Sequence, residues 1–158
     1  MTYSKQQLQD ELAIRQLTAS YSDGVNRGDI DDMAATYSED GVLSAFGAPD
    51  VVGRDNIRTT FADMYNGYRW IFQMTHSGTI EIEGDEAWCR WWVSEQSQNN
   101  SGVGGEFLGV YQDHVVRSAE GWRFARRLLQ GVYLGRRSFE GKVFDSPTIE
   151  TRPAILGR

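Results

Sequence analysis

The chain has 158 residues, of which 40% are hydrophobic and 24% charged, values that indicate one soluble globular domain. A formal net charge of −6 disfavours a nucleic-acid partner, and no apolar run approaches the ~20 residues needed to cross a bilayer. The single cysteine, Cys89, excludes an internal disulfide. We therefore expect a cytoplasmic protein that binds neither nucleic acid nor membrane.

The first part of the chain has helical spacing of its apolar residues. Residues 4–27 are predicted to form a long helix that opens with a capping box of Ser4 and Gln7. Shorter helices are predicted over 30–38 and 54–66. The apolar stripe of the first helix consists of Leu8, Leu12, Ile14, Leu17, Tyr21 and Val25.

The remainder of the chain alternates with a period of two, which is typical of strands. Residues 38–41 and 47–53 have the composition of turns or loops, and residues 135–158 form a polar tail that we expect to be extended. Helices followed by a run of antiparallel strands predict an α+β domain with its helices on one face of a sheet. The predicted strands cover 42–46, 71–83, 87–97, 106–117 and 122–134.

One histidine stands out on the strand over 71–83. By parity, His76 shares the apolar face with Ile80 and Ile82, whereas Glu81 and Glu83 take the opposite face. A buried imidazole needs hydrogen-bond partners, and its usual pKa near ~6.5 suits it to proton transfer. The strand alone is explained at least as well by a structural histidine as by a catalytic base.

Other kinds of site find little support in the sequence. The only other histidine, His114, is far from His76 in sequence, and there is no cysteine cluster. The glycines of 101–105 do not lie between a strand and a helix, as a phosphate-binding loop would require. We therefore expect no metal and no cofactor.

Three parts of the sequence form a recognisable set. They are an opening of Ile14-Arg15-Gln16-Leu17, Tyr21, Gly28-Asp29, Met33 and Tyr37-Ser38-Glu39-Asp40-Gly41, the strand residues Thr75-His76 before Gly78, and a late Glu120-Gly121-Trp122-Arg123-Phe124. The opening and the late segment resemble SnoaL-like proteins of the nuclear transport factor 2-like superfamily. Thr75-His76 before Gly78 is similar to the histidine strand of the dehydratase branch of that superfamily, which includes scytalone dehydratase, bile acid 7α-dehydratase and hexachlorocyclohexane dehydrochlorinase.

The resemblance implies a cone-shaped α+β barrel over residues 1–134, with a strongly curved, mostly antiparallel sheet and three N-terminal helices. The tail, 135–158, would then pack on this domain or on a neighbouring subunit. The resemblance also implies that His76 is the catalytic base and that Tyr21 is a polar partner on the first helix. Asn26 falls where the family has the carboxylate that pairs with the histidine, which is a departure from the pattern.

Two charged residues are further candidates for the same site. Glu95 shares strand parity with Trp91 and is a substitute for the missing carboxylate, although the tryptophans of opposite parity leave the facing of this strand open. Arg126 shares parity with Trp122 and Phe124 and would need an anionic partner if it points inward. A solvated arginine after a bulge explains Arg126 equally well. The expected substrate-binding residues are Val25, Phe61, Trp91, Tyr111 and Leu128.

These features favour a lyase that acts on a hydrophobic aromatic or polycyclic molecule, by elimination or by retro-aldol-like cleavage. Ser44-Ala45 stands where the steroid isomerases of the superfamily have an aspartate base, which disfavours that isomerisation. An isomerase, cyclase or epoxide hydrolase of the same fold is the alternative, and so is a non-catalytic ligand-binding or assembly module. Apolar residues in the tail also suggest a homodimer or homotrimer.

Overall fold

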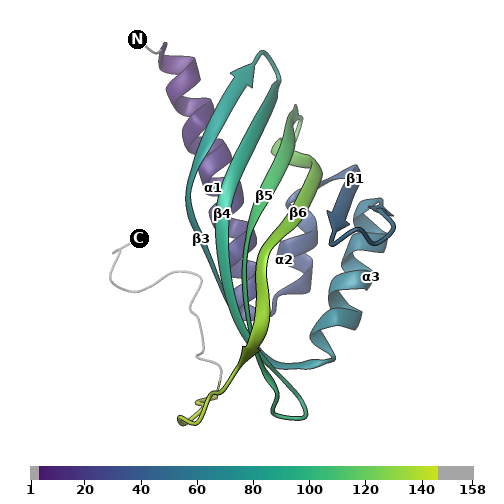
Figure 1. The fold of residues 1–158 in the computed structure, drawn as a ribbon. Helices are drawn as coiled ribbons and strands as arrows, with labels where there is room; N and C mark the ends of the chain where they lie inside the picture. The colour runs from purple at the N-terminus through teal and green to yellow at the C-terminus, as the bar shows by residue number, and fades with distance from the viewer. Residues whose placement is uncertain (1–3, 146–158) are drawn as a thin grey trace, which may run out of the picture.

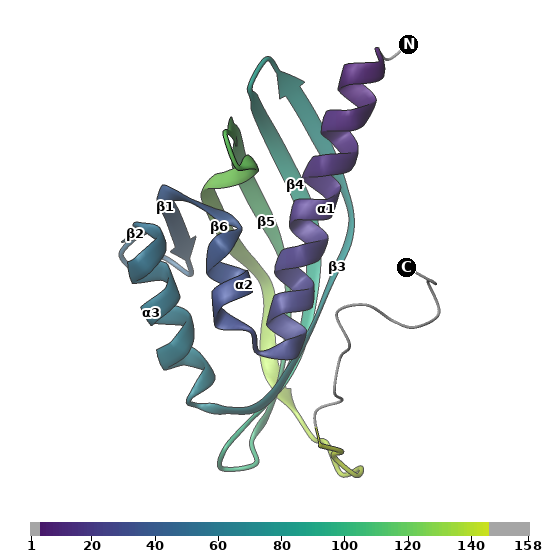
Figure 2. The ribbon, with the colours of Figure 1, turned by 180° about the vertical axis from the view of Figure 1, so that it is seen from behind.

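The computed structural model describes residues 4–145, in which three helices cover one side of a six-stranded sheet (Figures 1 and 2). The sheet has the order β2-β1-β6-β5-β4-β3. The helices are α1 (Lys5–Arg27), α2 (Ile30–Ala35) and α3 (Arg54–Tyr65). The strands are β1 (Tyr37–Ala45), β2 (Val51–Val52), β3 (Tyr68–Glu83), β4 (Glu86–Asn99), β5 (Gly104–Ser118) and β6 (Gly121–Arg137).

The sheet is mixed and strongly curved, so that its concave face wraps around the helices (Figure 2). All neighbouring strands are antiparallel except β1 and β6, which are parallel. The sheet stays open, with β2 at one edge and β3 at the other. This architecture confirms the predicted α+β fold with helices preceding a mostly antiparallel sheet.

The long helix α1 begins with the predicted capping box, in which Ser4 and Gln7 each bond the backbone N–H of the other. The first part of the predicted stripe is wrong, because Leu8 and Leu12 are 53% and 69% exposed. The face that turns to the sheet starts instead at the buried Asp10, which accepts a hydrogen bond from the Trp122 indole at 3.2 Å. It continues through Ile14, Leu17, Thr18, Tyr21 and Val25.

The second helix is shorter than predicted, because β1 begins at Tyr37. Residues 38–41, expected as a turn, belong to this strand. Tyr37 pairs with Phe124 of β6, and the register then shifts before Val42 pairs with Arg126. Pairing with a strand more than eighty residues later overrides the local turn composition.

β3 and β6 each carry two register shifts, and one shift in each strand changes which residues near the predicted site face the helices. In β3 the register shifts between Thr75 and Gly78, and in β6 it shifts between Phe124 and Arg126. Each bulge adds one residue to one strand, so the inward-facing parity switches at that point. Both shifts fall in the segments that the sequence singled out for the site.

The core lies between the helices and the concave face of the sheet. Its fully buried side chains include Ile14, Met33, Tyr37, Ile57, Val115 and Phe124. No helix within residues 4–145 is long and apolar enough to span a membrane.

Candidate active site

A pocket of about 470 Å³ opens between the helices and the concave face of the sheet. Its volume lies within the range usual for small-molecule sites. Most of its wall is apolar, contributed by Val25, Met33, Leu43, Phe61, Ile71, Phe107 and Leu129. The polar part of the wall comprises Tyr21, Thr60, Gln73, Glu95, Ser97, Asn99, Glu106 and Tyr111.

Of the two carboxyl groups in this polar part, Glu106 pairs with Arg137, and Glu95 on β4 forms no ion pair within residues 4–145. Burial raises the pKa of Glu95 above its ordinary value, and a hydrogen bond from Gln73 opposes the shift. The Gln73 amide donates to Glu95 Oε2 at 3.0 Å and to the Tyr111 hydroxyl at 3.1 Å. Glu95 Oε1 has no hydrogen-bond partner among residues 4–145 and is not sealed from the pocket.

The aromatic part of the site rests on a buried ion pair. Arg127 of β6 is 0% exposed and donates two hydrogen bonds to Asp113, at 2.9 and 2.7 Å. Its guanidinium lies 4.4 Å from the ring centroid of Tyr21, 4.1 Å from that of Tyr111 and 3.8 Å from that of Phe124. Three aromatic rings and one carboxylate therefore enclose the cation.

This arrangement sets the acidity of the two pocket phenols. Burial raises the pKa of Tyr21, and the nearby Arg127 cation partly opposes that rise. The pKa of Tyr111 is raised well above its ordinary value, mainly by burial and also by the neighbouring Tyr21. Both side chains therefore stay neutral at physiological pH. Burial lowers the pKa of Arg127, but Asp113 more than compensates and the guanidinium remains charged.

Asn26 does not contact His76 but fastens α1 to β3. Its amide group donates to the backbone carbonyl of Gln73 at 2.8 Å and accepts from the backbone N–H of Gln73 at 2.6 Å. Because β3 is an edge strand, these two backbone groups have no strand partner on that side. The amide of Asn26 therefore holds the segment of β3 whose Gln73 side chain bonds Glu95.

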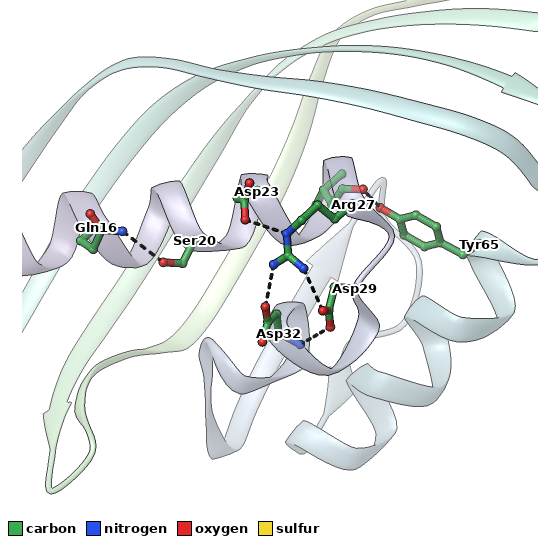
Figure 3. Close-up of polar contacts among 8 residues, drawn as sticks. Gln16, Ser20, Asp23, Arg27, Asp29, Asp32 and Tyr65 are labelled. Atoms are coloured by element: carbon green, nitrogen blue, oxygen red, sulfur yellow. Dashed lines mark hydrogen bonds and ion pairs between the residues drawn. The ribbon is translucent and has the colours of Figure 1, made fainter. Parts of the chain in front are cut away.

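The helices that wall the pocket are tied together by polar contacts (Figure 3). Arg27 at the end of α1 bonds Asp23, Asp29 and Asp32, and so joins α1 to the start of α2. The Tyr65 hydroxyl at the end of α3 donates to the backbone carbonyl of Val25 at 2.6 Å. Together these bonds fix the position of Val25 in the pocket wall.

The expected placement of His76 in the pocket is wrong. His76 is exposed on the outer face of β3, where its Nε2 lies 2.8 Å from the Ser94 hydroxyl. The bulge between Thr75 and Gly78 explains the error, because residues before it face inward at odd numbers and residues after it at even numbers. The side chain of β3 that reaches the polar part of the pocket is Gln73.

The placement of Arg126 was left open, and the structure turns it outward. Arg126 is exposed and pairs with Asp50 at 2.9 Å, whereas its neighbour Arg127 is buried. The β6 bulge between Phe124 and Arg126 switches the inward parity here as well. For the same reason Leu129, and not Leu128, lines the pocket.

The other predicted site residues divide into two groups. Tyr21, Val25, Phe61, Glu95 and Tyr111 line the pocket. Trp91 faces inward but is buried in the core beside the pocket rather than in its wall.

The sequence interpretation missed three polar residues of the site, Gln73, Asp113 and Arg127. Asp113 has the inward parity of Tyr111 on β5, which is a usable signal for a buried carboxylate that needs a cation. The inward facing of Gln73 and Arg127 can be predicted only when the positions of the bulges are known.

A metal site is not formed by the described residues. Within residues 4–145, no three His, Cys, Asp or Glu side chains lie close enough together to hold a metal ion. What the site does offer is one carboxyl with a raised pKa, two neutral phenols and an apolar wall. Such a set suits proton transfer to and from a small apolar molecule.

Comparisons with known proteins agree with this architecture. A candidate aromatic ring hydroxylase from Novosphingobium aromaticivorans is 25% identical, with a TM-score of 0.77 over 82% of this chain and 94% of its own. A candidate scytalone dehydratase from the same organism is 22% identical, with a TM-score of 0.76 over 87% and 97%. A type 2 hexachlorocyclohexane dehydrochlorinase, LinA, is 16% identical, with a TM-score of 0.78 over 90% and 97%. At these last two identities the similarity shows the fold alone.

The family assignment rests on the sequence itself. A search of curated proteins returned no significant match. The family model of the SnoaL-like domain, however, matches residues 6–128, which include every element from α1 to β5 and the buried part of β6. The chain therefore belongs to the SnoaL-like domain family.

Proposed function

We propose that the protein is a small-molecule lyase in which Glu95 is the proton-transferring group. The observation that carries the proposal is a carboxyl of raised pKa with one free oxygen, placed in an apolar pocket of about 470 Å³. A base whose pKa approaches the working pH is effective in proton transfer. The fold shared with scytalone dehydratase- and LinA-type proteins supports an elimination reaction.

The proposed reaction is an elimination from a hydrophobic aromatic or polycyclic substrate. Glu95 takes a proton from carbon, the C–H electron pair forms the new double bond, and the bond from the adjacent carbon to the leaving oxygen breaks. The protonated Glu95 then transfers its proton to the departing hydroxide, so water leaves and the carboxylate is restored. The hydroxyls of Tyr21 and Tyr111 would donate hydrogen bonds to an oxygen of the substrate that gains negative charge.

An isomerase is the second candidate, and the acidity of the phenols favours it. Because burial raises the pKa of both Tyr21 and Tyr111, neither is a good acid for expelling a leaving group. In an isomerisation the same carboxyl removes a proton at one carbon and returns it at another, and no leaving group is needed. The two reactions differ in product mass, since the lyase product is lighter than the substrate by one water and the isomerase product has the same mass as the substrate.

The experiment is a product screen by mass spectrometry with hydroxylated bicyclic and polycyclic compounds. With the wild-type protein we expect a product lighter by one water. Glu95→Gln keeps the size of the side chain but removes its basicity, so the rate should fall roughly 10²-fold or more. Turnover by Glu95→Gln at the wild-type rate would contradict the proposal, and a product of unchanged mass would select the isomerase.

A further inference from the structure

The charges around the pocket are distributed unevenly. Among the residues that line it within the described part of the chain, none is Arg, Lys or His. Two are acidic, Glu95 and Glu106. The wall therefore offers a ligand carboxyl groups, phenols, amides and hydroxyls, but no cation.

Two arginines that contact lining residues are already engaged in ion pairs. Arg127 lies behind the rings of Tyr21 and Tyr111, is 0% exposed and is neutralised by Asp113 through two hydrogen bonds. Arg137 pairs with Glu106. Because Glu106 is paired, Glu95 is the charged lining residue that has no ion-pair partner within residues 4–145.

An anionic ligand would thus meet an unfavourable environment. Its charge would leave water for an apolar wall without a compensating cation, and would lie close to Glu95 when that group is ionised. A hydroxyl or ammonium group, by contrast, can donate a hydrogen bond to the free Oε1 of Glu95.

From this charge distribution we infer that the pocket selects ring compounds that carry a hydroxyl or ammonium donor and rejects ring compounds that carry a carboxylate. The inference rests on the proposed function in that both place the substrate at Glu95. It goes further by fixing the charge class of the ligand, and it can be tested by binding without any turnover.

The test uses three probes of the same ring and similar size: 2-naphthylmethanol, 2-naphthylmethylamine and 2-naphthoate. Dissociation constants are measured by calorimetry at pH 8, where the amine is cationic and the acid anionic. We expect the alcohol and the amine to bind at least about tenfold more tightly than the carboxylate. Equal or tighter binding of 2-naphthoate would overturn the inference, and so would the failure of all three probes to bind at millimolar concentration.

Two variants assign the selectivity to the pocket. Glu95→Gln should raise the affinity for 2-naphthoate and so reduce the difference in dissociation constant between 2-naphthoate and the other two probes. Glu81→Gln removes an exposed carboxylate of β3 outside the pocket wall and should leave all three affinities unchanged. An unchanged difference in Glu95→Gln, or the same reduction in Glu81→Gln, would contradict the inference.

The binding and turnover experiments can refute the inferred ligand charge and the proposed role of Glu95 independently of each other. If 2-naphthoate binds well but Glu95→Gln abolishes turnover, the charge class is wrong and the proposed lyase stands. If the selectivity is observed but Glu95→Gln turns substrate over normally, the selectivity stands and the proposed role of Glu95 as base is wrong.

Discussion

At the scale of single residues, Glu95 combines a structural cost with a functional use. Its carboxyl is largely enclosed, and its pKa is raised because burial disfavours the charged form. A carboxyl group whose pKa is higher in the folded than in the unfolded protein contributes stability that is fully present at pH values below its unfolded pKa. That contribution is lost as the pH rises through the folded pKa. Ionised Glu95 therefore opposes folding at neutral pH.

The first prediction concerns the pH dependence of stability. Glu95→Gln cannot ionise, so its stability relative to the wild type should be greater at pH 8 than at pH 4. Urea unfolding at both values measures the difference directly. The same difference at pH 4 and pH 8 would show that the Glu95 pKa is not raised.

The second prediction concerns the buried pair of Arg127 and Asp113. Arg127→Met leaves the Asp113 carboxylate buried without its cation, and we expect a loss of about 3–5 kcal/mol in the free energy of unfolding. The double variant Arg127→Met/Asp113→Leu removes both charges and should recover most of that loss. A single variant that loses less than about 1 kcal/mol, measured by urea unfolding, would mean that Asp113 has another partner.

At the scale of elements, the two bulges decide which side chains enter the site. The β3 bulge is followed by Gly78, where a Cβ atom would lie 2.3 Å from the Arg90 carbonyl oxygen and 2.3 Å from the Trp91 ring. The chain passes so close to β4 at this point that a residue without a side chain is required. The bulge places Gln73 in the pocket and turns His76 outward.

The third prediction tests this close approach. Gly78→Ala should destabilise the protein by roughly 1–3 kcal/mol, because β3 or the Trp91 ring must move to admit the methyl group. Gly141→Ala is the matched control, since its Cβ would meet nothing within 4 Å, and a change within about 0.5 kcal/mol is expected. Equal thermal stability of the two variants would contradict the described packing.

The sequence predicted the elements well because their signals are local. The capping box of α1 and the alternation along β4 needed no tertiary information, whereas only the packing of the sheet shows that the Glu95 face of β4 turns toward the pocket. The bulges, by contrast, arise from pairing between distant strands, and a shift of one residue reverses the facing of all that follow. For this reason the sequence placed Tyr21 in the pocket and named Glu95 as a candidate on a strand of open facing, but it misplaced His76 and left Arg126 undecided.

At the scale of the whole molecule, the outer face of the sheet carries apolar side chains on neighbouring strands. Met74, Leu108 and Tyr133 are 48%, 41% and 49% exposed and lie in one row of the strand register with Ser94. Trp92 is 50% exposed and lies two residues before Ser94 on the same face of β4. A contiguous exposed apolar surface is typical of an interface, and we propose that a second copy of the chain covers it.

The fourth prediction follows from that proposal. Light scattering coupled to size-exclusion chromatography should show a homo-oligomer for the wild type, and Leu108→Glu should dissociate it by placing a charge in the row. The control Glu83→Gln alters an exposed position of β3 outside the row and should leave the mass unchanged. A monomeric wild type at micromolar concentration would contradict the proposal.

We propose that proton transfer takes place at Glu95 inside the pocket and not at His76 on the outer face of β3. The most direct measurement is the rate of product formation by the wild type, Glu95→Gln and His76→Ala on the same substrate. We expect the rate to fall roughly 10²-fold or more in Glu95→Gln and to stay near the wild-type value in His76→Ala. A severe loss in His76→Ala together with an active Glu95→Gln would contradict the proposal.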